Sequence, residues 1–416
     1  MSLPVDILLE ILYRLPVASL VRFRCVCKTW YHIMATPWFA KSHLACQQAS
    51  SSSNKYILYH DDNLCTLFTN SDPLFDSTKH SKLFYTPELF GIDFTCNNRD
   101  LEIYGACHGL VCVSRACYHI GNNIHLWNPI CRKVKKLPQI ETPIKDEFGL
   151  EIPIKDEFGH EPSAGMTFGY YCDDYKVIVI VYVKSTFIVF VYSLSTNSWN
   201  TIQTINFYID IKSIDYFVCT TKFVDGTAYM LTSIELVVCY ELNNKTFRVI
   251  KLPEDNDIAT MEAYGETIAL LETDQNYLTM WILRDKSSSS PWERKFSIAV
   301  PEVSSLRVTT SFQAVGFLPN GKYLLRNFEL EGDSCVTKLS LCDTEIPNLT
   351  EFRSFTELRS RFRLPPKYPT LHGRIDSNFV ESLLLFNEDN LHPFSLTEMD
   401  STCSSTLFTL QWSPTQ

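Results

Sequence analysis

A phrase of strand, tight turn and strand recurs after residue 100 and limits what this chain can fold into. Its copies, each with apolar runs on both sides of a glycine-containing turn, are residues 103–112, 223–230, 263–270 and 317–325. Asp225-Gly226 and Asn320-Gly321 are strong hairpin signals, because a type I′ turn needs positive φ at both of its central residues. The sequence therefore predicts a series of antiparallel hairpins in this region.

A second phrase consists of an outer strand that bears an aromatic residue and closes on another aromatic or on Leu-Pro. The aromatic residues Trp127, Tyr192, Tyr240 and Trp281 stand 65, 48 and 41 residues apart. A degenerate period of this size is typical of β-propeller blades, small sheets that stack radially because none buries both faces alone. We expect about six to eight blades, with strands near residues 379–386 and 56–59 closing the ring. A pair of β-sandwiches is the alternative.

The first 45 residues follow a different, helical pattern. Apolar residues recur at helical spacing, first at Ile7, Leu8, Ile11, Leu12 and Leu15 and then at Leu20, Phe23, Cys27 and Trp30. Pro4 suits a first helical turn, whereas Pro16 and Pro37 end helices before them. The pattern predicts three short helices with more apolar surface than they can hide. That surface either docks on a partner or packs on the rest of this chain.

These patterns predict an α+β multidomain protein. We expect a helical module at residues 1–45, a polar linker at 46–54 that contains four consecutive serines, and an all-β propeller at 55–416. A linker of that composition carries too little apolar surface to pack.

The helical module resembles an F-box. The residues that carry the resemblance are Leu3-Pro4, the run from Glu10 to Pro16, the run from Leu20 to Lys28, Trp30, Pro37, Phe39 and His43-Leu44. The resemblance implies binding to a Skp-type adaptor, which links the chain to a cullin-based ubiquitin ligase. It also implies the adaptor contacts, which would be Leu3, Pro4, Leu8, Ile11, Leu15 and Pro16.

The remaining motifs resemble, in order, those of the plant F-box-associated domain, a kelch-like β-propeller. They are Gly105 to Cys112, Leu126 to Pro129, Phe168 to Tyr170 with Asp174 to Val177, and Val191 to Trp199. Ala228-Tyr229-Met230 departs from the pattern, because the family often has a Trp after the Tyr. The S-locus F-box-like proteins of plants, whose targets are secreted ribonucleases in self-incompatibility, are a candidate subgroup.

Charge and cysteine content limit the partners and the compartment. The first 45 residues hold five Lys/Arg and two Asp/Glu, which leaves 32 basic and 45 acidic residues and a net charge of about −13 for the rest. Such a body should repel nucleic acid and anionic membranes. It is compatible with a basic protein partner, and the alternative is an acidic surface that serves solubility alone. No signal peptide or membrane-spanning run is visible, and fifteen cysteines then indicate reduced thiols in the cytoplasm or nucleus.

Nothing in the sequence has the spacing of a metal or catalytic site. Cys107, His108, Cys112, Cys117 and His119 crowd one hairpin, but zinc knuckles pair ligands two to four residues apart, so we interpret them as core thiols and histidines. Asp173-Asp174 could form a carboxylate pair, although aspartates are common in turns such as the one expected there. We therefore expect no cofactor, no metal and no catalytic residue.

The most individual segment is a tandem duplication. Pro-Ile-Lys-Asp-Glu-Phe-Gly occurs at residues 143–149 and again at 153–159. It could form an acidic, target-binding lip with contacts from Phe148, Asp156, Glu157 and Phe158. The alternative is an insertion that a surface loop tolerates, since loop length costs little.

The combined prediction is a non-catalytic substrate-recognition subunit of an SCF-type (Skp–cullin–F-box) ubiquitin ligase. Two alternatives remain open at this stage. One is an enzyme with a hydrolase or oxidase site in the propeller channel, and the other is a lectin-like binding module that acts independently of ubiquitin ligases.

Overall fold

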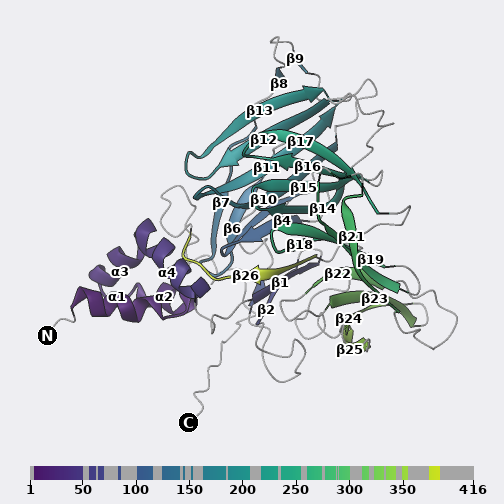
Figure 1. The fold of residues 1–416 in the computed structure, drawn as a ribbon. Helices are drawn as coiled ribbons and strands as arrows, with labels where there is room; N and C mark the ends of the chain where they lie inside the picture. Colours follow the sequence, from purple (N-terminus) through teal and green to yellow (C-terminus); the bar gives the residue numbers. More distant parts are fainter. Residues whose placement is uncertain are drawn as a thin grey trace.

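A computed structural model shows helices at the N-terminus followed by strands (Figure 1). It describes residues 4–49, 56–61, 64–69, 83–85, 101–115, 124–140, 144–145, 151–152, 163–183, 186–206, 217–232, 236–253, 260–273, 277–286, 288, 290–299, 312–317, 323–331, 334–342, 349–354 and 374–384.

Four helices form the N-terminal module, one more than the sequence predicts. They are α1 (Val5–Tyr13), α2 (Val17–Phe23), α3 (Lys28–Met34) and α4 (Pro37–Ala49). The expected second helix divides at Cys27, whose backbone is extended and whose Sγ accepts a hydrogen bond from the Trp30 amide at 3.5 Å. Because α4 continues to Ala49, residues 46–49 of the expected linker are helical.

Side chains of α4 hold the module together from within. His43 is fully buried, and its Nε2 donates to the carbonyl of Leu15 at 2.8 Å. One turn later, Gln47 Nε2 donates to the carbonyl of Tyr13 at 3.1 Å. Both carbonyls lie where α1 ends and α2 begins, so α4 satisfies backbone groups that have no partner within a helix.

The strands form six four-stranded antiparallel sheets and one short hairpin in the part of the chain that the structure describes. The sheets comprise β26 (Arg374–Phe379) with β1 (Tyr56–Asp61), β2 (Leu64–Thr69) and β3 (Leu83–Tyr85); β4 (Leu101–Cys107), β5 (Leu110–Arg115), β6 (His125–Asn128) and β7 (Lys133–Lys136); β10 (Ser163–Tyr171), β11 (Asp174–Val183), β12 (Thr186–Ser193) and β13 (Ser198–Asn206); β14 (Phe217–Val224), β15 (Thr227–Thr232), β16 (Leu236–Glu241) and β17 (Thr246–Lys251); β18 (Thr260–Tyr264), β19 (Thr267–Thr273), β20 (Tyr277–Leu283) and β21 (Trp292–Ala299); and β22 (Phe312–Phe317), β23 (Tyr323–Glu331), β24 (Ser334–Cys342) and β25 (Leu349–Ser354). The hairpin pairs β8 (Ile144–Lys145) with β9 (Glu151–Ile152).

The sheets are arranged as a propeller, as the sequence predicts. The strand at one edge of each sheet contacts the corresponding strand of the next sheet. These contacts follow a closed order, from β4 through β10, β14, β18, β22 and β26 back to β4. Pairing of β26 with β1, in which Tyr56 lies opposite Phe379, joins the two ends of the propeller. The closing strand is residues 374–379 rather than the expected 379–386. The structure describes six such sheets, and the number of about six to eight blades for the whole chain stays a prediction.

The glycine turns and aromatic strands take the roles that their phrases predict, with one correction. Asp225 and Gly226 have φ values of 44° and 70° and connect β14 to β15. Trp127, Tyr192 and Tyr240 are fully buried, but they lie on the third strand of their sheets, and the fourth strand is outermost. Residues 318–322, which contain the predicted Asn320-Gly321 turn, lie outside the described residues.

Hydrophobic clusters between neighbouring sheets form the core. One cluster joins β4–β7 to β10–β13, a second joins β10–β13 to β14–β17, and a third joins β14–β17 to β18–β21. The sheets β10–β13 and β14–β17 therefore bury both faces against their neighbours, as a radial stack requires.

Candidate docking site

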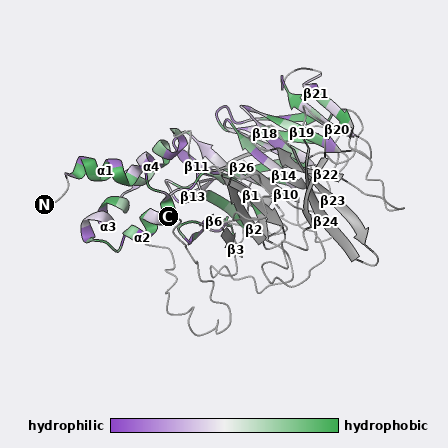
Figure 2. Cartoon of the chain, turned by 90° about the horizontal axis from the view of Figure 1, so that it is seen from below, coloured by the Kyte–Doolittle hydropathy of each residue, from purple (hydrophilic) through white to green (hydrophobic). Residues whose placement is uncertain are grey.

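The two faces of α1 have opposite environments. Leu8 and Leu12 are buried, whereas Val5, Ile7 and Ile11 are 56%, 50% and 43% exposed. Leu8 and Leu12 are four residues apart, as are Ile7 and Ile11, so each pair lies along its own line on the helix. Figure 2 shows the hydrophobic character of α1 near the N-terminus. The apolar stripe that the sequence predicts is thus divided between the core and the surface.

Exposed apolar side chains are concentrated on the helical module. Among the described residues, eight large hydrophobic residues are exposed, and seven of them belong to the module: Val5, Ile7, Ile11, Phe23, Val26, Tyr31 and Trp38. The eighth, Tyr277, lies in β20 of the propeller. Large apolar side chains left exposed in such number on one small module indicate a protein interaction site. We call these seven residues the apolar face of the module.

The buried side of the module packs on the propeller. One hydrophobic cluster contains Leu12 and Leu20 of the helices together with Val111, Trp127 and Ile130 of the sheet β4–β7. The helices lie beside β6 and β7 in Figure 1. The sequence left open whether the stripe packs on this chain or on a partner, and the structure assigns its inner part to this chain.

The six predicted adaptor contacts differ in exposure. Pro4 and Pro16 are exposed at the starts of α1 and α2, and Ile11 is exposed within α1. Leu15 is partly buried against the core, and Leu3 lies outside the described residues.

Leu8 is a core residue of the module and only 6% exposed, and its contact with an adaptor stays a prediction. Val5 and Ile7, which the sequence analysis did not name as adaptor contacts, are exposed. Helical spacing separates the two faces of α1, but it does not say which of them faces the propeller.

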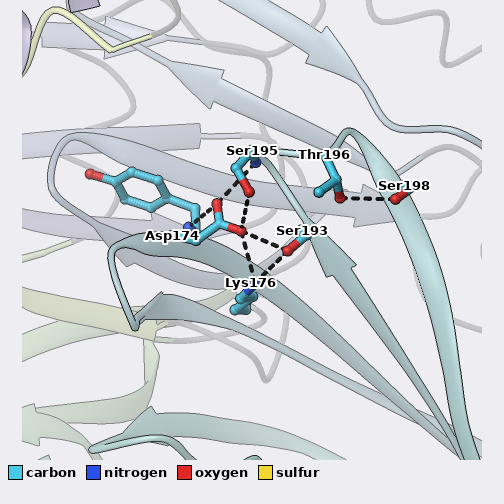
Figure 3. A network of polar contacts seen from close by, with 7 residues as sticks. Asp174, Lys176, Ser193, Ser195, Thr196 and Ser198 are labelled. Carbon is cyan, nitrogen blue, oxygen red and sulfur yellow. Dashed lines mark hydrogen bonds and ion pairs between the residues drawn. The ribbon is translucent and has the colours of Figure 1, made fainter. Parts of the chain in front are cut away.

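A network of polar contacts lies at the end of the sheet β10–β13 (Figure 3). Asp174 Oδ2 accepts hydrogen bonds from Lys176 Nζ at 2.8 Å, Ser193 Oγ at 2.6 Å and Ser195 Oγ at 2.8 Å. Its Oδ1 accepts from the amides of Tyr175 at 2.8 Å and Ser195 at 3.0 Å. Lys176 Nζ also contacts Ser193 Oγ. The carboxylate thereby connects β11 to the turn after β12.

The network sets the charge state of Asp174. Burial alone raises the pKa of this carboxyl group, but hydrogen bonds from Lys176, Ser193 and Ser195 outweigh it and lower the pKa to about 2. Asp173 precedes it in the turn with φ of 56° and accepts a hydrogen bond from Tyr170 Oη at 2.9 Å. The turn predicted there is confirmed, and both carboxylates already have hydrogen-bond donors within the chain.

The cysteine-rich hairpin is part of the core where the structure describes it. Cys112 is buried and Cys107 is partly buried, while Cys117 and His119 lie outside the described residues. His108 Nδ1 shares a hydrogen bond of 3.1 Å with Tyr175 Oη, and burial lowers the pKa of this histidine. No group of three or more metal-ligating side chains is found within the described residues.

The predicted target contacts Phe148, Asp156, Glu157 and Phe158 lie outside the described residues and stay a prediction. The hairpin β8–β9 covers part of the duplicated segment, and Ile144 pairs with Ile152 in it. β7 starts at the turn of residues 129–132 and runs away from it. The hairpin β8–β9 therefore follows at the opposite end of the sheet β4–β7. In Figure 1 it lies far from the helices.

Within the described part of the chain, the structure contains no helix of the length and apolar character needed to span a membrane.

Comparison with known proteins identifies both parts of the chain. The family model of the F-box domain matches residues 1–42, and that of the F-box associated beta propeller domain matches residues 56–349. The F-box protein CPR1 of Arabidopsis thaliana is 22% identical over 341 residues, covering 72% of this chain and 74% of that protein.

Two further relatives come from the same plant. F-box protein At2g40925 is 22% identical over 79% of this chain and 81% of its own length. F-box/kelch-repeat protein At3g23880 is 28% identical over 43% of this chain and 45% of its own.

Proposed function

Because the chain belongs to the F-box proteins with an F-box-associated β-propeller domain, we propose that it is the substrate receptor of an SCF-type ubiquitin ligase. Its helical module binds a Skp-type adaptor and, through the adaptor, a cullin. Its propeller holds a protein target beside the enzymes of the complex. The chain then acts by proximity, raising the effective concentration of the target without bond chemistry of its own.

The observation that carries this proposal is the apolar face of the module. The inner helical residues, such as Leu12 and Leu20, are fully buried on the propeller side, yet Ile7 and Ile11 stay exposed on α1. A chain that needed its helices only for stability would gain nothing from this exposed surface. A partner that covers this face would remove its apolar area from water. That burial stabilises the complex by about 25 cal/mol for each Å² of apolar surface covered.

The adaptor contacts on α1 follow from exposure. We assign them to Pro4, Val5, Ile7 and Ile11, with Pro16 at the start of α2. Leu8 supports this surface from beneath, because it packs in the same cluster as Leu12.

The propeller supplies the target site. Residues 46–416 carry the net charge of about −13, which supports a basic target, since complementary charge speeds association and opposes wrong partners. A secreted-type ribonuclease, the target class of the S-locus F-box-like proteins that the sequence resembles, is the specific candidate. The duplicated segment, with Phe148, Asp156, Glu157 and Phe158, is the proposed contact region. The proposal places the protein in the cytoplasm or nucleus.

The test uses the full-length chain and a purified plant Skp-type adaptor. The variant Ile7→Asp/Ile11→Asp adds two charges to the exposed side of α1, whereas the control Ala45→Asp/Gln48→Asp adds two charges to exposed positions of α4. We expect the α1 variant to lose adaptor binding at least tenfold and the control to bind as the wild type does. Circular dichroism must show equal helix content in all three proteins.

Equal adaptor binding by all three folded proteins would contradict the proposal. The exposed face of α1 would then serve another partner, and the propeller would act as a ligase-independent binding module.

A further inference from the structure

The chain continues past the strand that closes the propeller, and the residues after it are buried. β26 ends at Phe379, and residues 380–384 follow without strand pairing. Val380, Ser382 and Leu383 are nevertheless buried. Buried backbone outside a sheet needs hydrogen-bond partners from elsewhere. We call residues 380–384 the strap.

Asn128, at the end of β6, binds the strap with its side chain. Its Nδ2 donates to the carbonyls of Ser382 and Leu384, both at 2.9 Å. Its Oδ1 accepts from the amides of Ile130 and Cys131 at 3.1 and 3.0 Å. Every polar atom of this fully buried amide is therefore used. One side chain connects the β6–β7 turn to a segment more than 250 residues away.

Two further contacts place the strap directly on the turns of the sheet β4–β7. Cys131 Sγ donates to the carbonyl of Ser382 at 3.3 Å. Gly109, in the β4–β5 turn, has φ of +78°, and a Cβ there would lie 2.7 Å from Val380 O and from Ser382 N. Only glycine allows the strap to approach this turn so closely.

The strap also shares a hydrophobic cluster with the helical module. Leu383 is 1% exposed, in the hydrophobic cluster that contains Leu12 and Leu20 of the helices and Trp127 of β6. Burial raises the pKa of the Cys131 thiol to about 12, with smaller opposing effects from Glu381, which raises it, and Arg24, which lowers it. Glu381 belongs to the strap, and Arg24 directly follows α2. In Figure 1 the yellow segment after β26 lies between the helices and the propeller.

We propose that the strap holds the helical module in one orientation on the sheet β4–β7. Its hydrogen bonds to Asn128 and Cys131 attach it to the propeller, and Leu383 attaches it to the helices. The module is then held by the C-terminal end of the described chain as well as by its own covalent connection. Under the proposed function, the strap sets how the adaptor-binding face is oriented relative to the target.

The experiment is hydrogen exchange followed by mass spectrometry on the full-length chain, without adaptor. The variant Asn128→Asp keeps the acceptors but replaces the two donors with an oxygen that repels the strap carbonyls. The control Asn244→Asp makes the same change in the turn between β16 and β17, where Asn244 donates to Glu241 Oε2 at 2.8 Å on the surface.

We expect amides of α2 and α3 to exchange at least tenfold faster in Asn128→Asp, with β14–β17 unchanged. The Asn244→Asp control should match the wild type in α2 and α3. Unchanged exchange of α2 and α3 in Asn128→Asp would overturn the proposal. Because hydrogen exchange is measured without the adaptor, a failure of this proposal can be distinguished from a failure of the proposed function.

A second variant covers the case in which Asn128→Asp also loosens β14–β17. Leu383→Ala keeps the hydrogen bonds of the strap and removes its packing in the hydrophobic cluster that the helices share with the sheet β4–β7. Faster exchange confined to α2 and α3 supports the strap, whereas exchange equal to the wild type in both regions overturns it.

Discussion

Replacing Asp174 by Asn tests whether the polar network stabilises the propeller. The carboxylate accepts five hydrogen bonds, three of them from the side chains of Lys176, Ser193 and Ser195. The substitution keeps the shape of the side chain but removes its charge. It also places an amide group among these donors.

The magnitude follows from the pKa of the carboxyl group. A decrease from 3.8 to about 2 corresponds to about 2 kcal/mol at 1.36 kcal/mol per unit. The Asp174 side chain is 10% exposed, so water screens part of this energy. We therefore expect the carboxylate to contribute about 1–2 kcal/mol to the free energy of unfolding. Because the pKa is lower in the folded state, the contribution is complete above about pH 4. It is lost as the pH falls through about 2.

The assay is urea unfolding of the full-length chain, followed by tryptophan fluorescence at pH 7 and at pH 3. Asp174→Asn should lower the free energy of unfolding by about 1–2 kcal/mol at pH 7, and its difference from the wild type should shrink to about half at pH 3. The control Asp225→Asn makes the same change at an exposed position of the β14–β15 turn and should cost less than about 0.5 kcal/mol.

Two results would refute this reasoning. One is equal destabilisation by Asp174→Asn and Asp225→Asn at pH 7. The other is a difference between Asp174→Asn and the wild type that stays constant from pH 7 to pH 3, since the effect would then not come from the ionised carboxylate.

Two further predictions concern the module core and one tight turn. Leu12→Ala removes a fully buried side chain and should lower the free energy of opening of α1, measured by native-state hydrogen exchange, by about 2–5 kcal/mol; unchanged exchange of α1 would show that Leu12 is not a core residue. Gly226→Ala should lower the melting temperature more than Gly265→Ala. Both glycines have positive φ, but only at Gly226 would a Cβ meet another residue, the Tyr171 ring at 2.5 Å. Equal melting temperatures of the two variants would contradict the steric argument.

Much of the fold could be predicted because it depends on local patterns. Helical spacing from Ile7 to Leu15 indicates α1, and Asp225-Gly226 indicates a hairpin turn because of the φ values that such a turn needs. The spacing of Trp127, Tyr192 and Tyr240 indicates repeated sheets, although it does not show which strand of each sheet carries them. The division of the second helix at Cys27 escaped prediction, since the apolar spacing continues across it.

The candidate site could be predicted only in part. The residues of the F-box motif mark the module as a docking element, but the choice between Leu8 and Ile7 as surface residues depends on where the propeller lies. A helix with apolar residues on two sides carries no local signal for that choice, because its periodicity is the same whichever side is covered.

The sequence by itself determined the two-part organisation, the all-β propeller and the F-box, because each is encoded in spacings within a few tens of residues. Only the tertiary structure decided which face of α1 stays exposed, how Asp174 is held by Ser193 and Ser195, and how Asn128 meets the strap. Those contacts join residues from about 20 to more than 250 positions apart. Nothing local encodes such pairings, because they exist only once the strands have stacked and the ends of the propeller have met.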